Sequence, residues 1–179
     1  MTGVHVICAG AAALPFLWYI YRWSGIAGQR PPDRSLNTGI HVYSASAALF
    51  FLYYTAVVTA VNLSGLPERD AAYREAWGRD TFSPVLLFLW AVVLAPALEE
   101  LAFRGLLLRR VEKAAVTVPA VLISSLLFGM YHGNLSQGIT AAAAGLALGY
   151  AYVKTDAILV SVVMHIAVNA AVCLFWLPG

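Results

Sequence analysis

Two glutamates and an arginine stand in a stretch of chain that otherwise has the composition of a membrane helix. Glu99, Glu100 and Arg104 lie within the sequence EELAFR, directly after the uncharged residues 84–98. A carboxylate at membrane depth costs roughly 3 kcal/mol, so an acid retained there is by default a candidate functional residue. We therefore begin with what this pair could do chemically.

Helical geometry separates the roles of the two acids. Glu100 precedes Arg104 by four residues, the spacing and order that favour an ion pair on a helix. Glu99 lies about 100° around the same helix and lacks that partner. A carboxylate without a counter-charge in a poorly hydrated site is the stronger base when it ionises. Glu99 is therefore the better candidate general base and Glu100 the better structural acid, unless the group is only an ion network that joins helices.

Two other apolar segments carry polar side chains at comparable depth. His132 follows Phe128 by four residues near the end of one segment, and Asn169 follows His165 by four in the middle of another. A single His or Asn in a membrane span often serves only to bind neighbouring helices. Three segments with such groups must direct them toward each other or toward water. A glutamate, two histidines and an asparagine brought together have the components for hydrolysis.

The residue inventory argues against the other common peptidase mechanisms. An intramembrane aspartyl protease needs two membrane-embedded aspartates, whereas every aspartate here lies in a predicted loop. The His-Glu-x-x-His motif of zinc proteases is absent, and no serine has the glycine-flanked setting of a serine nucleophile. What remains is a glutamate and a histidine that activate water directly, with no metal and no cofactor.

The three motifs taken in order resemble those of a known family. They are Glu99-Glu100-x-x-x-Arg104, Phe128-x-x-x-His132 and His165-x-x-x-Asn169. They are similar to the motifs of the CAAX protease and bacteriocin-processing family (CPBP, or Abi), glutamate-type intramembrane endopeptidases that include the type II CAAX prenyl endopeptidases. The resemblance covers about residues 82–171, which we expect to form the catalytic core of a single domain, 1–179.

The resemblance implies a role for each motif residue. Glu99 and His132 would hold and deprotonate the attacking water, and His165 and Asn169 would form the oxyanion hole. Glu100 and Arg104 would position Glu99 and support the helix junction, with Phe128 in a supporting place. The implied substrate is a membrane-associated protein or peptide, cleaved in CAAX-type, bacteriocin-type or C-terminal sorting-tail processing. The chain is short for the family, so the prenyl endopeptidase substrate need not carry over.

Composition sets the elements that must position these residues. The chain is 61% hydrophobic and only 11% charged, with a mean hydropathy of +0.76. Soluble domains carry about 25% charged residues, so this chain belongs with polytopic membrane proteins. We expect an all-α membrane bundle of about six spans, near residues 4–21, 36–63, 84–110, 117–132, 137–153 and 158–177, with a short interfacial helix in loop 64–80.

Charge and cysteine content bound the surroundings. The net charge of +2 is small and no basic stripe exists, so nucleic acid is an unlikely partner. Basic residues favour the side that holds loops one, three and five, which places both termini outside the cytoplasm. We expect the plasma (inner) membrane of a prokaryote. Cys8 and Cys173 lie in apolar segments and are predicted to be free and buried. Gly145 and Gly149 are predicted to form a small-residue packing face.

Two functions of other classes stay open at this point. One is a non-catalytic membrane immunity or partner-binding scaffold that keeps the same motifs. The other is a transporter or proton relay that uses the buried acids, against which the small size and the lack of an evident internal repeat argue.

Overall fold

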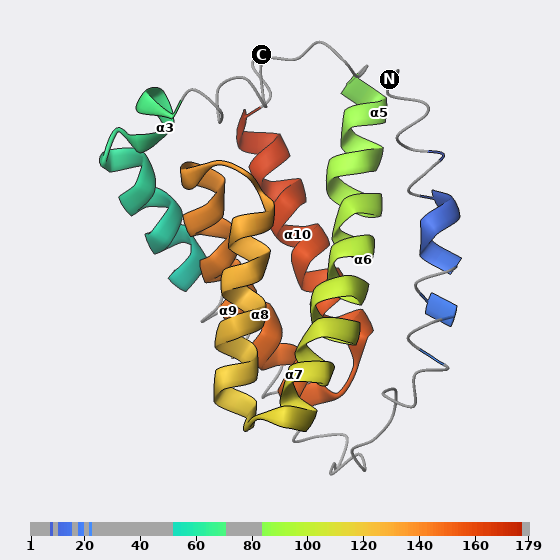
Figure 1. Cartoon of the computed structure of the whole chain (residues 1–179). Coiled ribbons are helices and arrows are strands. Elements are labelled where there is room, and N and C mark those ends of the chain that lie inside the picture. Colours follow the sequence, from blue (N-terminus) through green and yellow to red (C-terminus); the bar gives the residue numbers. More distant parts are fainter. Residues whose placement is uncertain are drawn as a thin grey trace, which may run out of the picture.

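The described part of the chain is entirely helical (Figure 1). The computed structural model describes residues 8, 11–15, 18–19, 22, 52–70 and 84–176, and no strand occurs among them. The all-α prediction is therefore confirmed for these residues. Of the loop 64–80, in which a short interfacial helix is expected, the structure describes residues 64–70, and they include a short helix, α3 (Leu66–Arg69). The rest of that loop, most of the first two predicted spans and both termini lie outside the described residues.

The C-terminal half supplies the helices that hold the predicted motifs. A helix over residues 52–63 precedes α3 (Leu66–Arg69). One long helical run follows, then three separate helices. The run comprises α5 (Pro84–Phe88), η1 (Leu89–Leu94), α6 (Ala95–Glu100), η2 (Leu101–Leu108) and α7 (Arg109–Ala114), and the helices are α8 (Thr117–Tyr131), α9 (Leu135–Thr155) and α10 (Ile158–Trp176). The predicted ranges for the last four segments agree with these bounds to within a few residues.

The long run contains two wide turns, η1 and η2, which lie on either side of α6. In η1 the N–H of Ala95 bonds to the carbonyl of Trp90, one residue further back than in a regular α-helix. The carbonyl of Ala91 consequently loses Ala95 as a donor. The following residue is Pro96, which has no N–H to offer. The carbonyl of Ala91 is thus left to accept from a side chain of another helix, which is Asn169 of the predicted site.

Helices α8 and α9 pack at close range because glycines line their contact. A Cβ on Gly129 would lie 2.5 Å from the carbonyl oxygen of Gly138, and one on Gly145 would lie 3.0 Å from the Cα of Ser125. Gly149 similarly faces the side chain of Val121. The small-residue face predicted on α9 is therefore a packing surface against α8. This close approach brings the end of α8 against the acid motif.

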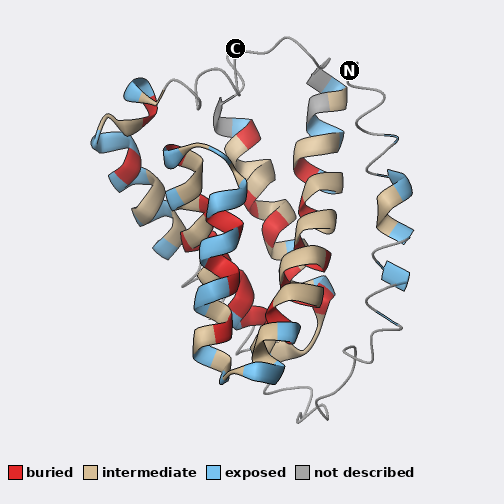
Figure 2. Cartoon of the chain, viewed as in Figure 1, coloured by how far each residue is buried: buried red, intermediate tan, exposed pale blue. Residues whose placement is uncertain are grey.

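Burial on α8 is the reverse of what a soluble helix shows. Its inward face holds small and polar residues, among them Ser124, whose hydroxyl donates to the carbonyl of Phe103 at 2.9 Å. Its outward stripe is large and apolar, namely Val118, Leu122, Leu126 and Met130. Figure 2 shows the buried residues gathered between the helices at mid-height and below. Among the described residues, no helix combines the length and the apolar composition that crossing a membrane requires.

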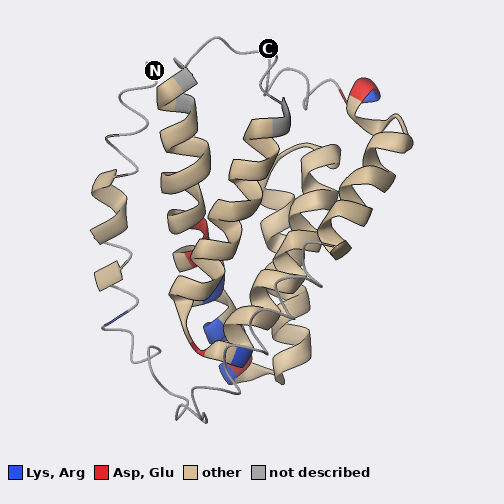
Figure 3. Ribbon diagram, turned by 180° about the vertical axis from the view of Figure 1, so that it is seen from behind, with Lys and Arg blue, Asp and Glu red and all other residues tan. Residues whose placement is uncertain are grey.

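One group of described charges lies at one end of the bundle, around α7 (Figure 3). The buried side chain of Arg109 lies at the centre of this group and bonds to Glu112 at 2.9 Å. It also donates to the hydroxyl of Tyr152 at 3.1 Å and forms an ion pair with Asp156. These contacts join the start of α7 to the end of α9. The acid motif, by contrast, lies at mid-height, away from this end.

Candidate active site

The acid motif begins with a fully buried ion pair. Glu100 and Arg104 are each 0% exposed, and Nη1 of Arg104 lies 3.0 Å from Oε1 of Glu100. The predicted pairing is confirmed. The guanidinium also stacks on the ring of Phe128 from α8, 4.4 Å from its centroid. Phe128 therefore lies between the guanidinium of Arg104 and the cavity, and its ring stabilises the buried charge by a cation–π contact.

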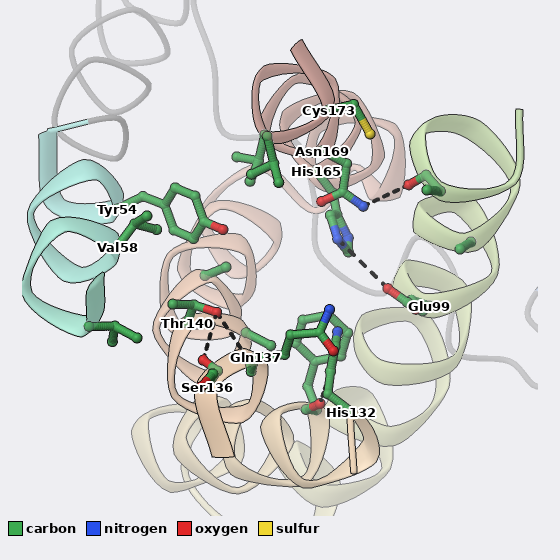
Figure 4. A pocket seen from close by; sticks show the side chains of 18 of the residues that line it. Tyr54, Val58, Glu99, His132, Ser136, Gln137, Thr140, His165, Asn169 and Cys173 are labelled. Carbon is green, nitrogen blue, oxygen red and sulfur yellow. Dashed lines mark hydrogen bonds and ion pairs between the residues drawn. The ribbon is translucent and has the colours of Figure 1, made fainter. Parts of the chain in front are cut away.

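His165 of α10 is held between the two glutamates. Its Nδ1 donates to Oε1 of Glu100 at 2.9 Å, because a carboxylate paired with a guanidinium can only accept. Its Nε2 faces Oε2 of Glu99 at 3.7 Å, as the dashed line in Figure 4 marks. The ring also stands edge-on to Phe128. One side chain thus contacts both acids from a helix that lies more than sixty positions away in the chain.

His132 closes α8 and presents one ring nitrogen to the cavity. Its Nδ1 lies 2.9 Å from the carbonyl oxygen of Phe128 and must donate, since a carbonyl only accepts. The neutral ring then keeps an acceptor lone pair on Nε2. The four-residue spacing of Phe128 and His132 makes this contact possible, and their rings meet at 88° with centroids 5.0 Å apart. His132 is therefore oriented as a proton acceptor.

Asn169 supplies the donor that η1 lacks. Its Nδ2 donates to the carbonyl of Ala91 at 2.8 Å, which satisfies the acceptor that Pro96 leaves without a backbone partner. An asparagine amide carries two N–H groups, and this bond uses one of them. The second remains for a group in the cavity. Asn169 thus has a structural bond that the spacing of residues could not reveal, in addition to its place in the cavity wall.

Glu99, His132, His165 and Asn169 line one cavity of about 250 Å³. Figure 4 shows Glu99 and His132 on one side of it, with Tyr54 of the helix over residues 52–63 across the space. The four predicted residues are therefore brought together, as the motif order requires. The supporting residues Glu100 and Arg104 lie behind this wall, and Phe128 forms part of it.

The rest of the cavity wall was not predicted. Apolar side chains come from the helix over residues 52–63 and from α10, while the first turns of α9 contribute polar side chains. Nothing in the spacing of these residues distinguishes them from ordinary packing. The unpredicted wall residues include Tyr54, Val58, Val61, Ser136, Gln137, Thr140, Val168 and Val172. Cys173 also lines the cavity and is free and buried, as expected. Cys8 is free as well, but it is exposed among the described residues and not buried as predicted.

The chemistry available in this cavity is acid–base chemistry. A carboxylate and an imidazole acceptor stand beside an amide that can donate, and beside the imidazole of His165, which donates into the cavity only when its Nε2 carries a proton. With that proton, this is the set that water-based hydrolysis of a peptide bond needs. Within the described part of the chain, no three His, Cys, Asp or Glu side chains converge as metal ligands would.

Comparisons with known proteins identify the family of this chain. Residues 81–171, about half of the chain, match the family described as Type II CAAX prenyl endopeptidase Rce1-like. A Bacillus subtilis (strain 168) protein named "Putative membrane peptidase YdiL" is 28% identical over 92 residues, which cover 51% of this chain and 38% of that protein. The chain thus matches well under two thirds of that relative's length. No solved structure matches. With the three motifs around one cavity, this chain belongs to the Rce1-like family of type II CAAX prenyl endopeptidases.

Proposed function

We propose that this chain is a glutamate-type, metal-independent endopeptidase that cleaves a membrane-associated protein or peptide. Glu99 and His132 activate the attacking water. His165 and Asn169 stabilise the oxyanion, and Glu100, Arg104 and Phe128 support them. The observation that carries the proposal is the convergence of Glu99, His132, His165 and Asn169 on one cavity from three parts of the chain. The family match supports peptide hydrolysis, and the motif residues lie within the matched region.

The contacts supply each element that hydrolysis by water needs. His132 keeps Nε2 as an acceptor because Nδ1 is bonded to the carbonyl of Phe128. Glu99 lies at the cavity wall without a direct bond to Arg104, whose ion pair is made with Glu100. Asn169 retains one N–H, and preorganised donors of this kind each stabilise an oxyanion by about 3 kcal/mol.

We further propose that the bundle is embedded in a membrane. The outward stripe of α8 is large and apolar, while its inward face is mostly small or polar. The relative from Bacillus subtilis is named as a membrane peptidase, which supports the same location. Substrates in the same membrane would then reach the cavity from the bilayer side. Reporter fusions at each terminus test the expected non-cytoplasmic placement, and a cytoplasmic C-terminus would contradict it.

One contact favours a second candidate, a non-catalytic membrane immunity or partner-binding scaffold. The amide of Asn169 is already bonded to the carbonyl of Ala91, so this residue has a structural reason to be present. Cells that lack the protein would separate the two functions when supplied with the Glu99→Gln variant. Rescue of their phenotype by this variant favours the scaffold, and failure to rescue favours the peptidase.

The peptidase itself is tested by comparing membrane proteins from cells with wild-type protein or with the Glu99→Gln variant. Mass spectrometry should find shortened termini only with the wild type. Glu112→Gln is the control, since it makes the same change from acid to amide at a carboxylate that lies outside the cavity. If purified Glu99→Gln protein cleaves the identified substrate at the wild-type rate, the assignment of the base is wrong.

A further inference from the structure

His165 contacts both carboxylates, an arrangement that the motif roles do not describe. Resting on the proposed function, we propose that Glu100 is a positioning residue for His165, which it holds in the Nδ1–H form. One proton is then shared between Nε2 of His165 and Oε2 of Glu99. The same proton decides whether His165 can act as an oxyanion donor.

The first step concerns Nδ1 of His165. Oε1 of Glu100 receives two contacts, one from Nη1 of Arg104 at 3.0 Å and one from Nδ1 of His165 at 2.9 Å. A carboxylate bonded to a guanidinium has no proton to donate, so the proton in the second bond belongs to Nδ1. A neutral His165 in this form has only a lone pair on Nε2. It could not donate to an oxyanion, contrary to the role implied for it.

The second step concerns the facing atoms Nε2 and Oε2. They lie 3.7 Å apart, and the side chains of His165 and Glu99 are 6% and 15% exposed. Without a further proton, two acceptors would face each other in a poorly hydrated wall. The buried group would then hold two carboxylates against the single guanidinium of Arg104, a net charge of −1. One additional proton makes the group neutral, and buried charge without compensation is strongly unfavourable.

Among the residues that the structure describes, few other ionisable groups bear on this balance. The ionisable groups that face His165 are Glu99 and Glu100 of α6, Arg104 of η2, and His132 at the end of α8. His132 already satisfies Nδ1 through the carbonyl of Phe128 in its neutral form. The extra proton therefore belongs to the pair formed by Glu99 and His165.

The position of that proton determines whether His165 can donate to the oxyanion and whether Glu99 can accept a proton from water. When it lies on Nε2, His165 can donate to the oxyanion and Glu99 is a carboxylate able to take a proton from water. The water oxygen then bonds to the scissile carbon while its proton passes to Glu99. As the carbon–nitrogen bond breaks, Glu99 returns this proton to the leaving nitrogen. Nε2 keeps its own proton throughout, so the site begins the next cycle unchanged.

The experiment combines ¹⁵N NMR of histidine-labelled full-length protein in detergent with kinetics. The signals of His165 are identified by their loss in His165→Ala. We expect a protonated Nδ1 in the wild type. Glu100→Gln replaces the charged acceptor with an amide, so the Nδ1–H form should lose its preference. Its kcat should fall on the order of 10²- to 10⁴-fold with little change in KM, by analogy with other acids that orient a catalytic histidine.

Two further variants complete the test. Glu112→Gln serves as the matched control and should leave the His165 signals and kcat as in the wild type. Glu100→Gln leaves Arg104 buried without its acid, so Glu100→Gln/Arg104→Met removes both charges and should fold while kcat stays low. A wild-type Nδ1 without a proton overturns the proposal, whether or not either variant folds.

The kinetic outcomes also separate this inference from the proposed function. If Glu99→Gln is inactive while Glu100→Gln keeps the wild-type kcat and the His165 signals, only the positioning role of Glu100 is wrong. If Glu99→Gln keeps full activity, the proposed function is wrong.

Discussion

Removing one member of the buried Glu100–Arg104 pair should destabilise the protein far more than removing both. The two side chains are fully buried and their charged atoms lie 3.0 Å apart, so each charge depends on the other for compensation. Leaving one buried charge without its partner typically costs about 3–5 kcal/mol. We expect this cost for Glu100→Gln and for Arg104→Met separately. The double variant should lose less than the sum, because no unpaired charge remains.

Thermal unfolding of detergent-solubilised protein measures this difference. For a chain of this length, about 1 kcal/mol shifts the Tm by roughly 2–4 °C, so each single variant should lower the Tm by roughly 6–20 °C. The coupling free energy of the cycle should be about 2–3 kcal/mol. Glu112→Gln should lower the Tm less than either single variant, because Arg109 keeps its contacts with Tyr152 and Asp156.

The reasoning fails if the effects of the two single variants simply add. Additivity would mean that the two charges do not interact, despite their distance. Single variants within about 2 °C of the wild type would be equally damaging, because they would require water to reach a pair that is 0% exposed.

Four other outcomes follow from particular contacts. Gly129→Ala should destabilise the protein by about 1–3 kcal/mol, because the new Cβ would lie 2.5 Å from a backbone oxygen. Gly149→Ala should cost less, because its Cβ would meet only side-chain atoms of Val121 and Leu108. Chemical denaturation of the two variants measures the difference. Asn169→Leu should cost about 1–3 kcal/mol in the same assay, since the Ala91 carbonyl loses its donor. Asp156→Ala should be about 1–2 kcal/mol less stable than Asp156→Gly, because φ is 52° there and both variants lose the ion pair. Chelators should leave the cleavage rate unchanged, and strong inhibition reversed by zinc would indicate a metal mechanism.

Local spacing along the chain was sufficient to predict the helices and the ion pair between Glu100 and Arg104. The apolar runs predicted the extents of α8, α9 and α10 to within a few residues, because each helix is set largely by its own residues. The start of α9 was predicted two residues late, since the cap at Asn134 was not used. The four-residue spacing predicted the contact between Glu100 and Arg104, because both lie on one helix. The same spacing related Phe128 to His132.

Contacts between helices needed the tertiary structure. His165 is 65 residues from Glu100, and no pattern in the chain shows that one imidazole lies between both acids. The bond from Asn169 to the carbonyl of Ala91 depends on a missing N–H at Pro96 and on the packing of α10 against η1.

The sequence by itself thus determined which side chains could do chemistry and on which helices they stand. The packing of those helices decided which ring nitrogen of each histidine faces the cavity, because that choice depends on acceptors supplied by other turns and other helices.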